Sequence, residues 1–157
     1  MAAKTNYLGT VHIADKDTPG QQVGVTSDGR MLVTPAGSAD AANGGLSTSY
    51  LAAAASTNLT VVKASPGKIY KVRAFNNGST AVFLKMFNKT TNPTLGSDTV
   101  FDKFEILAGS AGAGFIDDTN LGQAYSVGIA YALTAGFADS DTSPIGANVV
   151  SVTILYL

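Results

Sequence analysis

The amino-acid sequence predicts an all-β protein: an antiparallel β-sandwich, jelly-roll-like, with an extended N-terminal arm and a small hairpin. Short apolar runs separated by turn signals recur through residues 46–157, about eight of them, at the spacing typical of a sandwich. No helical pattern of the usual length separates these runs, which argues against a parallel βαβ sheet. A chain of 157 residues is long enough for one such domain to bury its own core.

Three apolar runs between residues 58 and 88 predict three consecutive antiparallel strands at 59–64, 69–75 and 81–87. The turn signals between them are Ser65-Pro66-Gly67 and Asn76-Asn77-Gly78-Ser79, and Asn-Gly favours a tight hairpin. Alternation places an aliphatic face in the core, with Tyr70, Val72, Ala74, Val82, Leu84 and Met86. The opposite face mixes rings and cations: Phe75, Phe83 and Phe87 with Lys71, Arg73 and Lys85. The simpler interpretation is that this face and Tyr70 pack under a neighbouring sheet. The alternative is that they bind sugar or protein.

Strands are also expected at 46–56, 100–107, 115–116, 124–134 and 149–157. Long loops are expected at 89–99 and 135–147, and a glycine-rich turn at 108–114. Asp117-Asp118-Thr119-Asn120 is predicted to close the short strand before it. The last run is strongly apolar, so we expect it to be a central strand.

The N-terminal part of the chain differs from the rest in composition. Residues 1–45 are predicted to be an arm, a hairpin and a linker, and residues 46–157 the sandwich domain. Residues 7–13 form a strand or an extended arm, Asp28-Gly29 turns a small hairpin, and residues 35–45 are a flexible linker. This layout is typical of an attachment segment or a swapped element. A poorly ordered terminus is the alternative.

Charged residues make up 13% of the chain, about half the usual share, which favours a subunit that works in an assembly. Residues 63–103 carry seven bases and two acids, whereas residues 104–157 carry five acids and no base. This charge asymmetry has two explanations. Either the two parts form solvated faces of opposite sign, or they steer subunits toward each other electrostatically. There is no clustered basic stripe, so nucleic acid is not an expected partner. A membrane partner is not expected either, because the start lacks a signal-peptide pattern and no apolar run approaches the ~20 residues of a membrane span.

Candidate chemistry is sparse. Cysteine is absent, and His12 is the one histidine, which we expect on the surface. The pairs Asp117-Asp118 and Asp139-Ser140-Asp141 offer oxygen ligands for Ca²⁺, but the spacing favours turn chemistry. Glu105 is the one glutamate, so a glycosidase pair is not supported, and the glycines of 108–114 lack the residues of a phosphate-binding loop. The sequence therefore predicts a protein that is not an enzyme, with no catalytic, cofactor or metal residue.

Residues 56–157 resemble a family of small virion proteins of tailed bacteriophages, the head-decoration or cement proteins. The resemblance rests on turn and strand patterns: Val62-Lys63-Ala64-Ser65, Asn76-Asn77, Leu84-Lys85-Met86-Phe87-Asn88-Lys89, residues 92–99, residues 138–142 and the final Leu155-Tyr156-Leu157. It implies a β-sandwich that trimerises and sits on the outer capsid lattice.

The sequence and the resemblance lead to one main functional hypothesis. The protein is expected to bind the major capsid protein on the virion surface, as a homo-oligomer expected to be a trimer, after synthesis in the host bacterial cytoplasm. The expected partner-binding residues lie in the N-terminal segment: Tyr7, Leu8, Val11, Ile13 and Arg30. The alternative is a receptor- or carbohydrate-binding module of a phage head or tail fibre, using the mixed face or the loops at 89–98 and 135–147.

Overall fold

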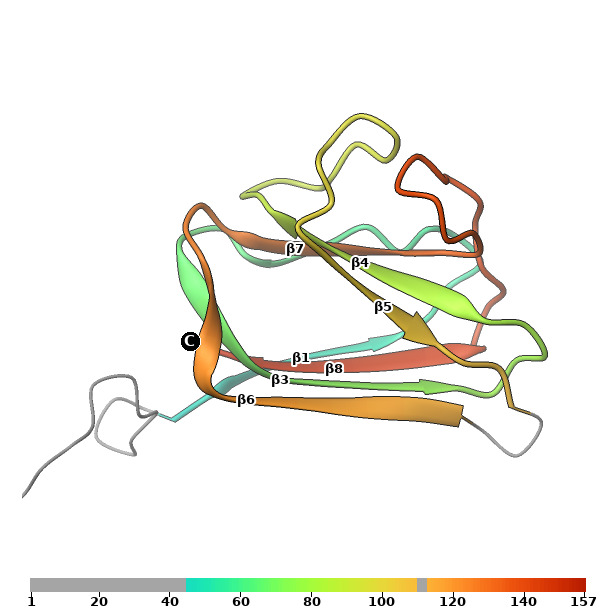
Figure 1. Ribbon diagram of the computed structural model, residues 1–157, viewed down its shortest axis with the longest axis horizontal. Coiled ribbons are helices and arrows are strands. Elements are labelled where there is room, and N and C mark those ends of the chain that lie inside the picture. Colours follow the sequence, from blue (N-terminus) through green and yellow to red (C-terminus); the bar gives the residue numbers. More distant parts are fainter. Residues whose placement is uncertain (1–44, 110–112) are drawn as a thin grey trace, which may run out of the picture. The chain divides into compact units, whose positions relative to one another are not determined.

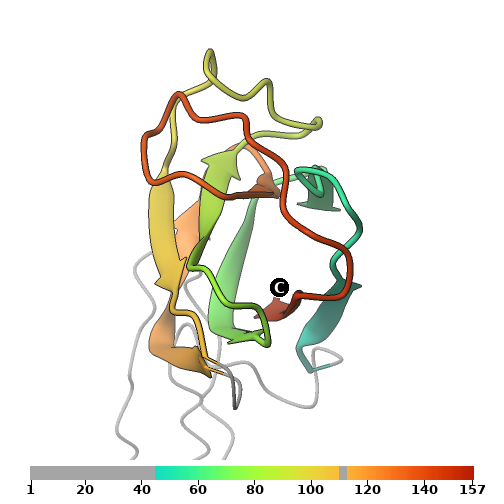
Figure 2. The same cartoon turned by 90° about the vertical axis from the view of Figure 1, so that its right-hand side faces the viewer.

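The computed structural model describes residues 45–109 and 113–157, which form eight β-strands and no helix (Figure 1). The strands are β1 (Ser47–Ala52), β2 (Thr60–Lys63), β3 (Gly67–Asn76), β4 (Val82–Asn88), β5 (Asp102–Ile106), β6 (Ala113–Tyr125), β7 (Ile129–Thr134) and β8 (Val150–Tyr156). They build two four-stranded antiparallel sheets, seen as two layers in Figure 2. The predicted β-sandwich is confirmed. Among the residues described, no helix is long and apolar enough to span a bilayer.

The sheets have the strand orders β1-β8-β3-β6 and β2-β7-β4-β5. The first strand therefore pairs with the last, the second with the seventh, the third with the sixth, and the fourth with the fifth. Strand β8 lies between β1 and β3, so the predicted central position of the last strand is confirmed.

The predicted strands at 59–64, 69–75 and 81–87 exist, but the prediction that they pair consecutively is wrong. Both edges of β3 are occupied by β6 and β8, so β4 lies in the other sheet, between β5 and β7. The chain crosses between sheets at Asn76, whose side chain is fully buried. Its Oδ1 accepts a hydrogen bond from the Gly78 N–H (2.8 Å), and its Nδ2 donates to the carbonyl oxygens of Thr80 (2.9 Å) and Ile106 (3.1 Å). The Asn-Gly signal marks a side-chain-supported crossover between sheets rather than a hairpin.

The predicted alternation in β3 is also shifted at its start. Val72 and Ala74 are buried as expected, but Ile69 rather than Tyr70 is the next buried residue. The register of β3 against β6 and β8 slips between Ile69 and Lys71, as a β-bulge does, and this moves the inward position by one residue.

Strand β6 runs unbroken through the predicted turn at 117–120. It pairs with β3 there, with Val72 opposite Asp117 and Lys71 opposite Asp118. Lys71 Nζ lies 3.0 Å from Asp118 Oδ2, and both acids point to solvent. The acidic pair is thus an exposed strand segment with a cross-strand ion pair, and the predicted turn is wrong.

The single strand predicted at 124–134 is two strands, because the chain turns at Ser126–Gly128. The side chain of Asn88 supports this turn. Its Oδ1 accepts hydrogen bonds from the N–H groups of Val127 (2.8 Å) and Gly128 (3.3 Å), and its Nδ2 donates to Ser126 Oγ (2.9 Å). Gly128 is required by close packing, since a Cβ there would lie 2.7 Å from the Lys89 carbonyl oxygen and 2.9 Å from that of Lys63.

The space between the two sheets is filled by aliphatic side chains with two tyrosines. The fully buried members include Val72, Leu84, Met86, Ile106, Tyr125, Ile129, Tyr131, Leu133, Val152 and Ile154. Strands β3 to β8 each contribute at least one buried residue to the main cluster, and Leu51 of β1 and Val62 of β2 are partly buried and pack against it. This continuous core makes the sandwich a rigid support for whatever its outer faces carry.

Candidate functional site

The two sheets differ in what covers their outer faces. Residues 89–101 and the first part of the connection 135–149 lie beyond the β2-β7-β4-β5 sheet, on the side away from the other sheet, and the second part of 135–149 then returns to β8 (Figure 1). Under them, side chains that alternate away from the core are nevertheless buried: Phe83, Lys85, Phe87, Ala130 and Ala132. Phe87, Ala130 and Ala132 form a second apolar cluster, against which Val61, Leu95 and Val100 pack. We call this the covered face.

Lys85 lies at the centre of the covered face, with no exposed surface. Its ammonium group donates hydrogen bonds to three main-chain carbonyl oxygens of the 135–149 connection: Ala138 (2.7 Å), Asp141 (2.9 Å) and Asp139 (3.4 Å). Burial lowers the pKa of Lys85, and the nearby Asp141 carboxylate opposes that shift. The three donors of the ammonium group match the three acceptors of the connection.

Lys103 holds the same connection from β5. Its Nζ donates to the Phe137 carbonyl oxygen (2.8 Å) and to Asp139 Oδ1 (2.7 Å), and it lies 3.7 Å from the centre of the Phe137 ring. The Phe137 ring also contacts Phe83 edge to face, with centroids 5.6 Å apart. The hydrogen bond from Lys103 lowers the pKa of the Asp139 carboxyl below its usual value.

The acidic segment 139–142 therefore performs turn chemistry, as the sequence predicts. Asp141 Oδ1 accepts hydrogen bonds from the N–H groups of Gly136 and Ser143 (3.0 Å each), and its Oδ2 accepts one from the Ser143 hydroxyl (3.1 Å). Burial would raise the pKa of Asp141, but these hydrogen bonds and Lys85 lower it below its usual value. Within residues 45–109 and 113–157, no group of three or more His, Cys, Asp or Glu could hold a metal ion.

The other long connection is held in a similar way. Asp98 accepts hydrogen bonds from Lys89 Nζ and from the Thr94 N–H, and the hydrogen bond from Lys89 is the main reason that the pKa of Asp98 is lowered. The basic and acidic parts of the chain also meet, since Lys71 pairs with Asp118 and Lys103 with Asp139. Bases of residues 63–103 are thus partly neutralised by acids of residues 104–157 within one chain.

The outer face of the β1-β8-β3-β6 sheet carries no such connection among the described residues, and we call it the open face. The register aligns its outward side chains in rows across the four strands. One row consists of Tyr50, Thr153, Arg73 and Ile116, and the next of Ala52, Ser151, Phe75 and Gly114. Three large apolar residues of this face are strongly exposed: Tyr50 (67%), Ile116 (66%) and Phe75 (47%).

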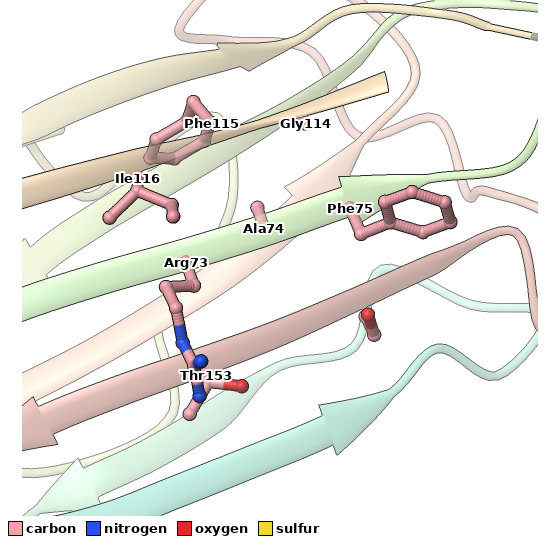
Figure 3. Close-up of a pocket in the computed structure, with 8 residues that line it drawn as sticks. Arg73, Ala74, Phe75, Gly114, Phe115, Ile116 and Thr153 are labelled. Carbon is pink, nitrogen blue, oxygen red and sulfur yellow. The ribbon is translucent and has the colours of Figure 1, made fainter. Parts of the chain in front are cut away.

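The open face is hollowed on both sides of Phe75. A hollow of about 570 Å³ lies over β3, β6 and β8, and Phe75 and Gly114 are among the residues that line it. A second, of about 400 Å³, extends toward Tyr50 and shares Phe75 and Ser151 with the first. In Figure 3 the Arg73 side chain extends from β3 over β8 to the vicinity of Thr153, while Ile116 and Phe75 flank it on neighbouring positions. The Arg73 guanidinium, the Phe75 ring and two hydroxyl-bearing side chains thus line the first hollow, and Tyr50 adds a second exposed ring at the adjoining one.

The mixed face predicted from the sequence is therefore divided between two sheets. Phe83, Lys85 and Phe87 are packed, as the simpler interpretation predicts, but under loops rather than under a sheet. Phe75 and Arg73 are exposed on the open face. Sequence reasoning missed Tyr50, Ile116, Ser151 and Thr153, which join these two only through the cross-strand register.

The predicted partner-binding residues Tyr7, Leu8, Val11, Ile13 and Arg30 lie outside the described residues, as do His12, the predicted hairpin and almost all of the predicted linker. Those expectations therefore stay predictions. Comparisons of the chain with protein-family models, curated proteins and solved structures gave no match.

Proposed function

We propose that this protein is a non-enzymatic virion structural protein of a tailed bacteriophage, a decoration or cement protein that binds the outer surface of the major capsid shell. In this proposal the sandwich is a jelly roll that forms homotrimers, and the N-terminal residues Tyr7, Leu8, Val11, Ile13 and Arg30 contact the capsid.

The observation that carries the proposal is the strand pairing of first with last, second with seventh, third with sixth and fourth with fifth. A long antiparallel ribbon folded over itself gives this order, which supports the predicted jelly roll. Jelly rolls occur in viral capsid and lectin domains. The phage resemblance of residues 56–157 covers seven of the eight strands, β2 to β8, and so points to the capsid use of the fold.

Decoration would stabilise a shell by mass action. A protein that binds the assembled lattice and not the separated subunits shifts the equilibrium toward the assembled form. Such a role needs a rigid body and a means of attachment. The continuous core supplies the first, and the N-terminal segment is the proposed source of the second.

Deletion of residues 1–34 tests this proposal. We expect the shortened chain to unfold in a cooperative transition like that of the full chain, but to stay in the supernatant when isolated phage heads are pelleted. Equal occupancy of heads by the shortened and full chains would contradict the proposed attachment.

A second candidate function is a receptor- or carbohydrate-binding module, and the open face favours it. Lectin domains share the jelly-roll architecture, and exposed aromatic residues beside polar groups are typical of ligand sites. Of the loop residues predicted for this role, Phe137 is 66% exposed, but its ring already contacts Lys103 and Phe83. The open face is the better location, because among the residues that the structure describes neither the Tyr50 ring nor the Phe75 ring has such a contact.

A further inference from the structure

Arg73 is the key residue of the open face. Its guanidinium group has no hydrogen bond or ion pair within residues 45–109 and 113–157, whereas its neighbour on the same strand face, Lys71, is paired with Asp118. It belongs to the row that begins with Tyr50 and ends with Ile116, and Phe75 follows two residues later on the same face. A cation without a counter-ion at the centre of an apolar and hydroxyl-bearing surface is complementary to an anionic ligand.

We propose that the open face binds a carboxylated saccharide, such as a uronate-containing polysaccharide. The planar guanidinium of Arg73 suits bidentate recognition of a carboxylate. Thr153 and Ser151 provide hydroxyl groups that can both donate to and accept from sugar hydroxyls. Tyr50 and Phe75 provide rings against which the apolar faces of sugar rings pack.

The spacing fits a short oligosaccharide rather than a single ion. Tyr50 and Arg73 are two strands apart, which is about 10 Å between Cα atoms, and Phe75 is about 7 Å along the strand from Arg73. The two hollows, of about 570 and 400 Å³, meet at Phe75 and Ser151 and lie within the size range of small-molecule sites.

Tyrosine, phenylalanine and arginine are common at protein interfaces, but two other features argue against such a role for the open face. The central strand β8 presents Ser151 and Thr153 between the aromatic positions, and interface centres are depleted in serine. Stacking the open faces of two copies would also bring two Arg73 guanidinium groups toward each other without a carboxylate between them. Asp118, which lies in the neighbouring row, is already paired with Lys71.

This inference deepens the second candidate function and rests on it. The test is affinity electrophoresis of the full chain in native gels that contain polygalacturonate, dextran sulfate or neutral dextran. We expect polygalacturonate to retard the protein, dextran sulfate to do so less, and neutral dextran not at all. Because the formal net charge of the protein is −1 at pH 7, we do not expect net charge alone to cause binding to a polyanion.

Single substitutions then identify the site. Arg73→Gln should weaken binding roughly tenfold to a hundredfold, because a charge-assisted hydrogen-bonded pair is lost. Arg73→Lys should retain only part of the affinity, and Tyr50→Ala and Phe75→Ala should each weaken binding severalfold. Lys63→Gln is the matched control, since it removes one positive charge from β2 of the other sheet and should leave binding unchanged.

Four results of the gel assay would overturn the inference: no retardation by any polymer, retardation by neutral dextran alone, retardation by dextran sulfate equal to or stronger than that by polygalacturonate, or equal loss of binding in Arg73→Gln and Lys63→Gln. Capsid occupancy is measured on the same variants, and Arg73→Gln should still sediment with heads. Loss of occupancy in Arg73→Gln would identify the open face as a protein contact and would also overturn the inference. Absence of head binding by every variant, with sugar binding intact, would instead count only against decoration.

Discussion

Lys85 and Lys103 lie directly opposite each other on the antiparallel strands β4 and β5. Like charges in this position repel, and Lys85 is in addition fully buried. The 135–149 connection offsets this repulsion, because its main-chain carbonyl oxygens and Asp139 accept hydrogen bonds from both ammonium groups. Two lysines on the sheet and one loop therefore form a single structural unit that closes the covered face.

Replacing Lys85 tests this unit. Lys85→Met should lower the free energy of unfolding by about 2–4 kcal/mol, because three loop carbonyls lose a charged donor. Lys103→Met removes the more exposed lysine of the unit, whose partner Asp139 is 65% exposed, and should cost less, about 1 kcal/mol. Urea unfolding gives both values, and limited proteolysis should cut the 135–149 connection faster in Lys85→Met. A Lys85→Met protein as stable as the parent would show that the lysine does not hold the loop.

Acid should weaken the same loop. The pKa of Asp141 is lowered from its usual 3.8 in the folded protein, so the carboxylate contributes stability above that pH, and this contribution is lost as pH falls through the lower folded value. Melting temperatures between pH 6 and pH 2.5 should therefore fall at the acid end. Asp141→Asn should be less stable at neutral pH and show a shallower fall below about pH 4. Parallel curves for the two proteins would exclude Asp141 as a contributor.

Phe83 and Phe75 occupy similar places in the sequence pattern but opposite environments. Phe83 is 8% exposed under the 135–149 connection, whereas Phe75 is 47% exposed on the open face. Phe83→Ala should cost about 3 kcal/mol and Phe75→Ala less than about 1 kcal/mol in chemical unfolding. Equal costs for the two substitutions would contradict the assignment of the covered and open faces.

The turn between β6 and β7 depends on Gly128. Gly128→Ala places a methyl group within 3 Å of two main-chain oxygens, so we expect a loss of about 1–3 kcal/mol in thermal or urea unfolding. Ser126→Ala is the control in the same turn, since it removes one exposed hydrogen bond with Asn88 and should cost about 0.5 kcal/mol. Gly128→Ala with no greater effect than Ser126→Ala would be inconsistent with the described turn.

Local patterns predicted the strands well and their partners poorly. Alternation identified the inward side of β4, but the burial of Lys85 depends on a loop more than 50 residues away in the sequence. The only sign of the break in the apolar run at 124–134 is Gly128, because the group that supports the turn is Asn88 on another strand. An antiparallel sandwich is built mainly from such distant contacts, and a single sequence does not show them.

The candidate site illustrates the same limit. Arg73 and Phe75 stand out in the sequence as a cation and a ring on one side of a strand. Tyr50, Thr153 and Ile116 join them only because β1, β8, β3 and β6 align in one register. A one-residue slip of any of these strands would turn its side chain to the other face.

The central claim is that this chain binds the outer surface of a phage capsid, and cosedimentation tests it most directly. The full chain would be mixed with isolated tailed-phage heads prepared without the protein, and the pellet would be assayed for saturable occupancy. The account predicts that the protein pellets with heads, at a stoichiometry that reaches a plateau, and that light scattering of the free protein gives the mass of a trimer. A monomer that stays in the supernatant at all head concentrations would contradict the decoration proposal.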